Sequence, residues 1–124
     1  MKKEKRLRVA FYARVASERA ITEENVNQFE QCLNYINKNG YELAGSYSYT
    51  GSGLNTNNPV MNDLRADAAA GKFDTVVVHD ISRISRNAHA ARAFLDEMQM
   101  HGVTVESVKD PRGGNALWQL KRIK

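Results

Sequence analysis

The chain has 124 residues, of which 42% are hydrophobic and 26% charged, and its formal net charge is +4. This length predicts a single domain, and this hydrophobic fraction is enough to bury a core. One cysteine excludes a disulfide framework, and no apolar run reaches the length of a signal-peptide core or a membrane span. We therefore expect a cytoplasmic protein with no membrane contact.

The first part of the chain predicts a strand, a helix and a second strand. Residues 7–15 are apolar and β-inclined, and Thr22 then provides an N-cap followed by acids in the first turn of a helix. Apolar residues at spacings of three and four predict the buried stripe of this helix: Val26, Phe29, Leu33 and Ile36. Asn39-Gly40 ends the helix, and alternating apolar residues over 41–49 predict the second strand.

The second part of the chain repeats this order. A polar, glycine-containing loop at 50–58 precedes a helix that begins at Pro59 and ends at Gly71. Residues 73–78 form an almost continuous apolar run, which is typical of a central strand covered on both faces. A third helix from about 88 to 101 and a strand from Val103 follow. The predicted buried positions of the two helices are Met61, Leu64 and Ala68, and Ala91, Phe94, Leu95 and Met98.

Alternating strands and helices with short connections predict an α/β fold. We expect three layers, with a mostly parallel central sheet of about four strands and helices on both faces. In such sheets, functional sites form at the carboxyl ends of the strands. Three segments meet at that edge, namely residues 14–17, the glycine loop after Tyr49 and the polar turn after Val78.

Three arginines belong to these segments. Arg83 and Arg86 are three residues apart, so one helical turn places them on one face, and Arg14 lies at the same edge of the sheet. Arginine suits a phosphate site because its planar fork donates two parallel hydrogen bonds and stays charged. The alternative is that Arg83 and Arg86 begin a solvated helix and pair with acids such as Asp80.

The motifs in these segments resemble the catalytic domain of the serine site-specific recombinases, the resolvase and invertase family. The matching residues are Tyr12-Ala13-Arg14-Val15, Gln28, Ser52-Gly53 and Ser82-Arg83-Ile84-Ser85-Arg86-Asn87. Their order and spacing agree over about the first hundred residues. The first motif alone is weak, but its pairing with the last one after a buried strand is fairly specific.

The resemblance implies site-specific DNA recombination, as found in mobile elements. A serine hydroxyl attacks a DNA phosphodiester, and a DNA hydroxyl later displaces the phosphoserine, with neither metal nor cofactor. It also implies that Arg14, Arg83 and Arg86 hold the phosphate and that Gln28 supports the site. The same resemblance places four further residues at the phosphate or DNA: Ser52, Gly53, Ser82 and Asn87.

The chain departs from the family pattern at the nucleophile. Ala16 occupies the serine position, and a methyl group does not attack phosphorus. Ser17 faces away from Arg14 on a regular strand, so only a bulge would make it a substitute. Tyr49 stands where the family often has an acid, and Asn58 where it usually has an arginine. Either the serine was replaced deliberately or catalysis was lost naturally, and several changes around one site favour natural loss.

The resemblance divides the chain into a catalytic domain at 1–108 and a short basic tail at 109–124. We see neither the family's long pairing helix nor a DNA-binding domain, so we expect weak contact with backbone phosphates and a monomer or weak homodimer. There are two alternative functions. One is a non-enzymatic relative that binds DNA or protein. The other is a flavodoxin-like module for a phosphorylated ligand, and the pairing of the Tyr12–Val15 and Ser82–Asn87 motifs argues against it.

The cysteine and the histidines offer no second chemistry. Cys32 lies inside a helix among apolar neighbours, which predicts a packed thiol. The three histidines, His79, His89 and His101, have no metal-site spacing with it, so we expect no metal. His79 follows the central strand near the arginines and is expected to be a surface histidine.

Overall fold

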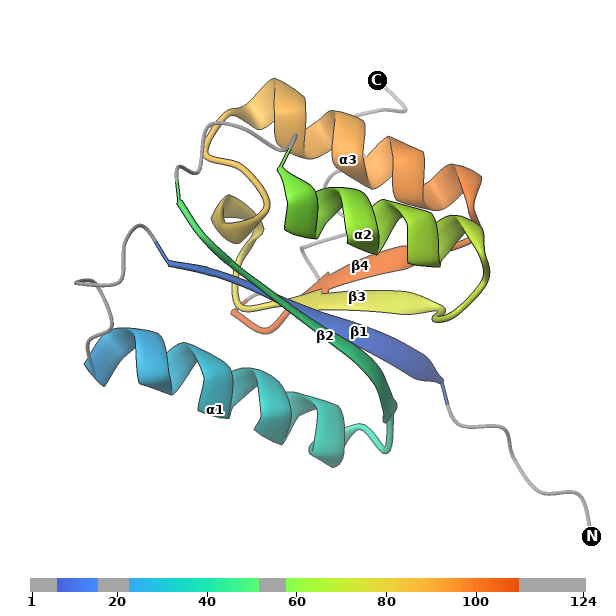
Figure 1. Cartoon of the computed structure of the whole chain (residues 1–124). Coiled ribbons are helices and arrows are strands. Elements are labelled where there is room, and N and C mark those ends of the chain that lie inside the picture. Colours follow the sequence, from blue (N-terminus) through green and yellow to red (C-terminus); the bar gives the residue numbers. More distant parts are fainter. Residues whose placement is uncertain (1–6, 16–22, 52–57, 110–124) are drawn as a thin grey trace, which may run out of the picture.

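The computed structural model describes residues 7–15, 23–51 and 58–109 (Figure 1). Helices and strands alternate along these residues: β1 Arg8–Val15, α1 Glu23–Lys38, β2 Glu42–Thr50, α2 Pro59–Ala69, β3 Thr75–Val78, the short 3₁₀ turn η2 Ile81–Arg83, α3 Ala88–Met100 and β4 Thr104–Ser107. The strands form one four-stranded sheet in the order β2-β1-β3-β4, and every neighbouring pair is parallel. The expected α/β class is confirmed.

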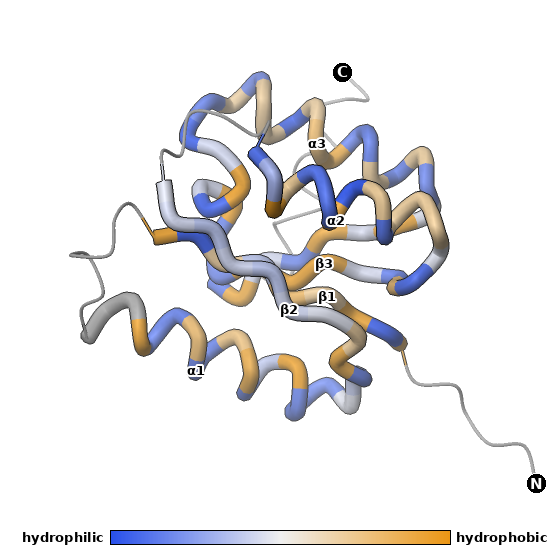
Figure 2. Tube along the Cα trace, viewed as in Figure 1, coloured by the Kyte–Doolittle hydropathy of each residue, from blue (hydrophilic) through white to orange (hydrophobic). Residues whose placement is uncertain are grey.

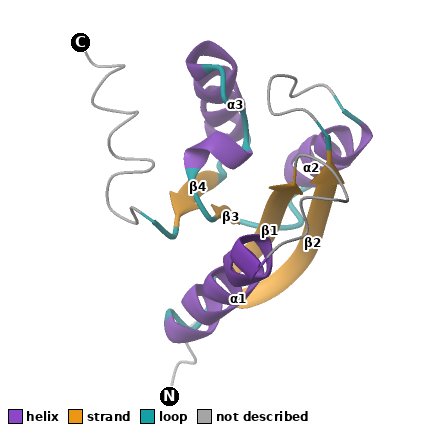
Figure 3. Ribbon diagram, turned by 90° about the vertical axis from the view of Figure 1, so that its left-hand side faces the viewer, coloured by secondary structure: helices purple, strands orange, loops and turns teal. Residues whose placement is uncertain are grey.

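The sheet separates two hydrophobic layers. Helix α1 covers one face, while α2 and α3 cover the other (Figures 1 and 3). Side chains along β1 alternate between the faces, so Phe11 packs in the α1 layer and Tyr12 in the α2/α3 layer. The valines of β3 are fully buried, as expected for a central strand. Strands β1 and β3 are therefore the rigid centre from which the functional loops leave.

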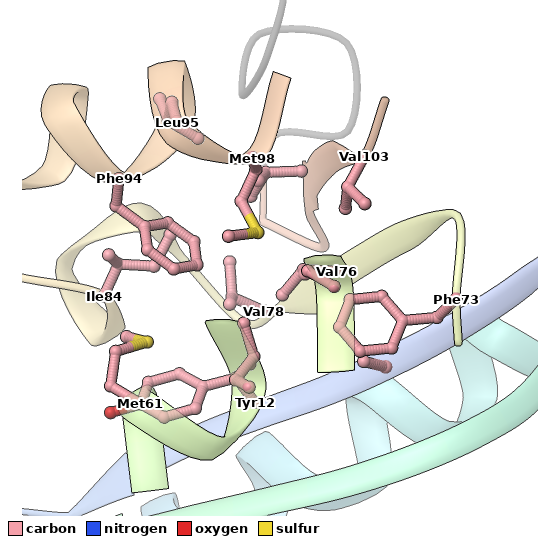
Figure 4. Packing of buried hydrophobic residues seen from close by; sticks show 14 residues of the cluster. Tyr12, Met61, Phe73, Val76, Val78, Ile84, Phe94, Leu95, Met98 and Val103 are labelled. Carbon is pink, nitrogen blue, oxygen red and sulfur yellow. The ribbon is translucent and has the colours of Figure 1, made fainter. Parts of the chain in front are cut away.

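The larger core lies between the sheet and helices α2 and α3. Figure 4 shows Met61 of α2 and Phe94 and Met98 of α3 gathered over Tyr12 and Val78. The buried positions predicted for these two helices are confirmed. Burying each such side chain contributes about 1.5–3 kcal/mol. This layer fixes the starts of α2 and α3, which flank the carboxyl edge of the sheet.

Helix α1 is rotated relative to the expected stripe. Val26 is 47% exposed and Leu33 is 41% exposed, so two of the four predicted positions are wrong. The buried residues are Gln28, Cys32 and Ile36, which recur every four residues. Hydropathy alone predicts that valine and leucine are buried in preference to glutamine and cysteine. In the fold, however, a side chain of α1 is buried only if it lies on the side of the helix that faces the sheet. The prediction of a packed Cys32 is confirmed.

Two strand boundaries also differ from the sequence pattern. Strand β3 begins at Thr75 rather than at 73, because Asp74 accepts hydrogen bonds from the backbone and the guanidinium of Arg8. Strand β4 begins at Thr104 rather than at Val103 and extends to Ser107. Strand β2 lies at an edge of the sheet and is mostly pale in Figure 2, as its serines and tyrosines dictate. Within the three described ranges, none of the helices has the length and hydrophobicity that crossing a bilayer requires.

Candidate functional site

Arg14 lies next to the end of β1 and is only 6% exposed. It follows Tyr12 by two residues, so its side chain leaves the sheet on the α2/α3 side. Its Nη1 donates to the carbonyl of Gly51 at 3.3 Å, and its Nη2 donates to the carbonyl of Ser82 at 3.4 Å. The guanidinium thus bridges the ends of β1 and β2 and the turn after β3.

Arg83 joins the same cluster from η2. Its Nη1 donates to the carbonyl oxygen of Arg14 at 3.2 Å. Its Nε lies 3.5 Å from Oδ2 of Asp80, so the ion pair that the sequence offered as an alternative is also present. Arg83 therefore belongs both to the arginine cluster and to a local ion pair.

The positive charges of the three arginines act on one another. Burial is the main reason that the pKa of Arg14 is lowered, and the positive charges of Arg83 and Arg86 lower it further. Arg86 is exposed just before α3. The buried Nε of Arg14 has no hydrogen-bond partner among the described residues. A buried cationic donor without a partner is costly.

Asp80 organises the turn that carries these groups. It is the N-cap of η2, and its Oδ1 accepts hydrogen bonds from the backbone N–H of Ser82 at 3.1 Å and from the Ser82 hydroxyl. Burial acts to raise the pKa of Asp80, but hydrogen bonds from Ser82 and His79 and the charge of Arg83 outweigh it, so the pKa is lowered. Asp80 is therefore a carboxylate that holds the Ser82 carbonyl towards Arg14.

Gln28 and Asn87 belong to helices on opposite faces of the sheet. Gln28 is 1% exposed on the inward side of α1, which covers the other face of the sheet. Asn87 is the N-cap of α3, and its Oδ1 accepts from the backbone N–H of Ala90 at 3.0 Å. It thus starts the helix directly after Arg86. Supporting roles for both in a reaction stay predictions.

Four candidate residues, Ala16, Ser17, Ser52 and Gly53, lie outside the described residues. Their attachment points are nevertheless close together. The backbone N–H of Gly51 donates to the carbonyl of Val15 at 2.9 Å, so the described ends of β1 and β2 lie side by side.

A buried polar pair under Arg14 was not predicted as a site feature. Tyr12 is 1% exposed and Asn58 is 4% exposed. Burial raises the pKa of Tyr12, while a hydrogen bond from Asn58 and the charge of Arg14 oppose that rise. The Asn58 Oδ1 also accepts from the backbone N–H of Met61 at 2.8 Å. The Asn-Pro sequence indicated the helix start, but no local signal indicated the contact with Tyr12.

The site is cationic and offers no cluster of metal ligands. Within the described part of the chain, no group of three or more histidine, cysteine, aspartate or glutamate side chains is placed to hold a metal ion. The donors that converge are guanidinium N–H groups, which suit phosphate and carboxylate oxygens. This geometry defines an α/β domain with an arginine cluster at the carboxyl edge of its sheet.

Comparison with known proteins gives the family. Residues 9–120 match the family model described as "Resolvase, N terminal domain", and the chain belongs to that family. A curated relative, "Resolvase" from Clostridium perfringens, is 28% identical over 100 residues, which cover 80% of this chain and 48% of the relative. The chain thus spans about half the length of that relative.

Solved structures agree in fold. The N-terminal catalytic domain of TP901-1 integrase matches with a TM-score of 0.82 and 22% identity, over 94% of this chain and 92% of that chain. A resolvase family site-specific recombinase from Streptococcus pneumoniae matches with a TM-score of 0.77 and 23% identity, over 95% and 85% of the two chains. These identities show the shared architecture and leave the chemistry to be argued from the residues.

Proposed function

We propose that this chain is the catalytic-domain part of a serine site-specific recombinase and that its arginine cluster holds a DNA phosphate. The observation that carries this proposal is the placement of Arg14. It is almost fully buried, it is held by the carbonyls of Gly51 and Ser82, and its Nε has no partner among the described residues. Membership of the resolvase family supports the same function.

The chemistry of strand exchange suits this arrangement. Attack on a phosphodiester builds negative charge on the equatorial oxygens of phosphorus. Guanidinium groups held in place beforehand stabilise that charge without reorganising during the step. Arg14 and Arg83 are fixed by main-chain carbonyls, whereas Arg86 is exposed and free to approach a duplex from the solvent side.

We propose further that the chain does not cleave DNA, because Ala16 occupies the position of the nucleophile. Two other departures support natural loss over a single deliberate replacement. Asn58, at the family's arginine position, is buried and commits its Oδ1 to the first turn of α2. Tyr49 supplies no carboxylate at the family's acid position. Ser17 stays a substitute only if the strand end bulges.

A second candidate function is a non-enzymatic relative that keeps the fold and the anion site and binds DNA or another protein. The same buried arginine supports it, since phosphate binding does not require a nucleophile. In both cases we propose a domain at 1–108, a basic tail at 109–124, weak contact with DNA backbone, possible homodimers and a cytoplasmic location. A role in a mobile element follows from the family.

Binding to a labelled duplex of about 20 base pairs tests the anion site. Arg83→Gln and Arg86→Gln should each weaken binding at low salt and reduce the slope of log K against log salt by about one. The matched control is Lys72→Gln, an exposed cation next to the opposite end of β3. If the control weakens binding as much as the arginine variants, general charge and not the cluster binds the duplex.

Restoring the hydroxyl tests the catalytic part of the proposal. Ala16→Ser should be incubated with a pool of supercoiled plasmids carrying random-sequence inserts, and denatured samples searched for covalent protein–DNA adducts by mass spectrometry. Adducts at residue 16 would show that one atom separates this chain from an enzyme. An unaltered chain that forms adducts through Ser17 would contradict the proposed loss of cleavage.

A further inference from the structure

His79 contacts two oxygen atoms, one on each side of its ring. It follows β3, and its Nδ1 lies 3.0 Å from Oδ2 of Asp80. Its Nε2 lies 2.8 Å from Oε1 of Gln31 on α1. The ring is mostly covered, with 17% of the side chain exposed. His79 therefore links helix α1 to the turn that carries the arginine cluster.

The number of protons on the ring matters at this position. A neutral imidazole has one N–H and donates one hydrogen bond, whereas an imidazolium donates two. Two acceptor oxygens are both satisfied when the ring is an imidazolium. The alternative is a neutral ring with the Gln31 amide turned to present its NH₂ group.

Asp80 connects this ring to the arginines. The same Oδ2 atom that faces His79 also lies 3.5 Å from Nε of Arg83. A carboxylate beside Arg83 reduces the attraction of the cluster for a phosphate, because unlike charges offset one another. A proton on His79 gives Asp80 a second cationic partner and leaves more of the Arg83 charge to the phosphate.

We propose that His79 is a positioning residue for phosphate binding, and that it takes up a proton through its contact with Asp80 when the arginine cluster binds a phosphate. This inference rests on the proposed function of the cluster. The coupling is reciprocal, so protonation of His79 strengthens phosphate binding to the same degree. Histidine is the side chain whose charge ordinarily changes between about pH 5 and pH 8.

None of the described groups near His79 is expected to change its own charge between about pH 5 and pH 8. From η2, Asp80 is held as a carboxylate. From α1, the contact is the uncharged amide of Gln31; the nearby Cys32 thiol, which interacts with Asp80, stays protonated because burial raises its pKa to about 12. The arginines on β1 and η2 stay charged at these pH values. From β4, the Ser107 hydroxyl and the Lys109 backbone N–H donate to the His79 carbonyl and do not titrate.

The dissociation constant of a labelled duplex, measured at pH 8 and pH 6 with constant ionic strength, tests the inference. A DNA phosphodiester keeps one charge over this range, so the probe itself does not titrate. Binding should tighten by about fivefold on going to pH 6. His79→Gln should abolish this change, while His89→Gln, an exposed histidine on α3, should keep it. An unchanged pH response in His79→Gln would overturn the inference.

A second variant keeps the test clear of folding effects. Gln31 is exposed, and Gln31→Glu places a second carboxylate at Nε2 of His79. This change should move the midpoint of the binding transition to higher pH by about half a unit or more. A midpoint that stays in place or moves to lower pH would contradict the inference.

Nitrogen-15 spectra of the histidine rings separate this inference from the proposed function. On addition of duplex at pH 7, His79 should change towards the doubly protonated pattern, whereas His89 and His101 should not. If Arg83→Gln abolishes duplex binding but His79 shows no change in the parent chain, only the inference fails. If the parent chain does not bind the duplex at either pH, the proposed function fails with it.

Discussion

The guanidinium of Arg14 donates from Nη1 to the carbonyl oxygen of Gly51 at 3.3 Å, so a cation at the end of β1 is held by the main chain at the end of β2. A Cβ at position 51 would overlap the ring and hydroxyl of Tyr49. A larger residue at position 51 therefore requires the Tyr49 side chain or the backbone of position 51 to move.

Gly51→Ala should displace the Gly51 carbonyl and loosen Arg14. We expect the free energy of unfolding to fall by about 1–3 kcal/mol and duplex binding to weaken. Thermal unfolding and duplex affinity measure the two effects. The control is Gly71→Ala, which meets open space at a positive φ of 77° far from the cluster. That variant should lose about 1 kcal/mol of stability through strain and keep its affinity.

The N-caps of α2 and α3 offer a matched pair. Asn58 and Asn87 each accept a backbone hydrogen bond at the start of a helix, but Asn58 is 4% exposed and also contacts Tyr12. Asn87→Ala should cost about 1 kcal/mol, whereas Asn58→Ala should cost about 2–3 kcal/mol, since it leaves a buried hydroxyl without its partner. Urea unfolding measures both. Equal costs would contradict the buried pair.

The rotation of α1 predicts opposite results for two of its apolar residues. Ile36 is 2% exposed, whereas Leu33 is 41% exposed. Ile36→Ala should therefore lower the free energy of unfolding by about 2–4 kcal/mol through the cavity that it leaves. Leu33→Ala should cost less than about 1 kcal/mol. Equal costs would support the stripe that hydropathy alone predicts, because that stripe contains both residues.

Cys32 should react slowly in the folded chain. Burial raises its pKa to about 12, so about one molecule in ten thousand carries a thiolate at pH 8. In urea the same thiol has its ordinary pKa, near 8.5, and about a quarter is ionised. Iodoacetamide should alkylate the native protein at least about a hundredfold more slowly than the unfolded protein. Comparable rates would show that the α1 layer opens readily.

Asp80 should stabilise the fold in a pH-dependent way. Hydrogen bonds from Ser82 and His79 and the charge of Arg83 lower its pKa against the opposing effect of burial. A lowered pKa stabilises the fold above the unfolded-state value of about 3.9, and this stabilisation is lost as the pH falls through the folded value. Asp80→Asn should thus destabilise the chain at pH 7. The difference in the free energy of unfolding between this variant and the parent should become smaller below about pH 4. Asp63→Asn, exposed on α2, is the control.

Much of the architecture follows from local sequence patterns. The periodicities of α2 and α3 predicted their buried residues, because in both helices the apolar side chains are the ones that face the sheet. The arginine cluster was also predictable. Short connections force every parallel strand to end at the same edge, so Arg14 and Arg83 meet there although they are 69 residues apart.

The contacts that tune the cluster follow only from the folded chain. His79 and Gln31 are 48 residues apart, and neither sequence neighbourhood carries a sign of their contact. The same holds for the carbonyl of Gly51 under Arg14 and for the side of α1 that meets the sheet. Hydropathy and turn preferences are properties of neighbouring residues, whereas these contacts depend on how a complete layer of side chains packs. Residue types thus specify the elements and their order, and tertiary packing decides which polar groups meet.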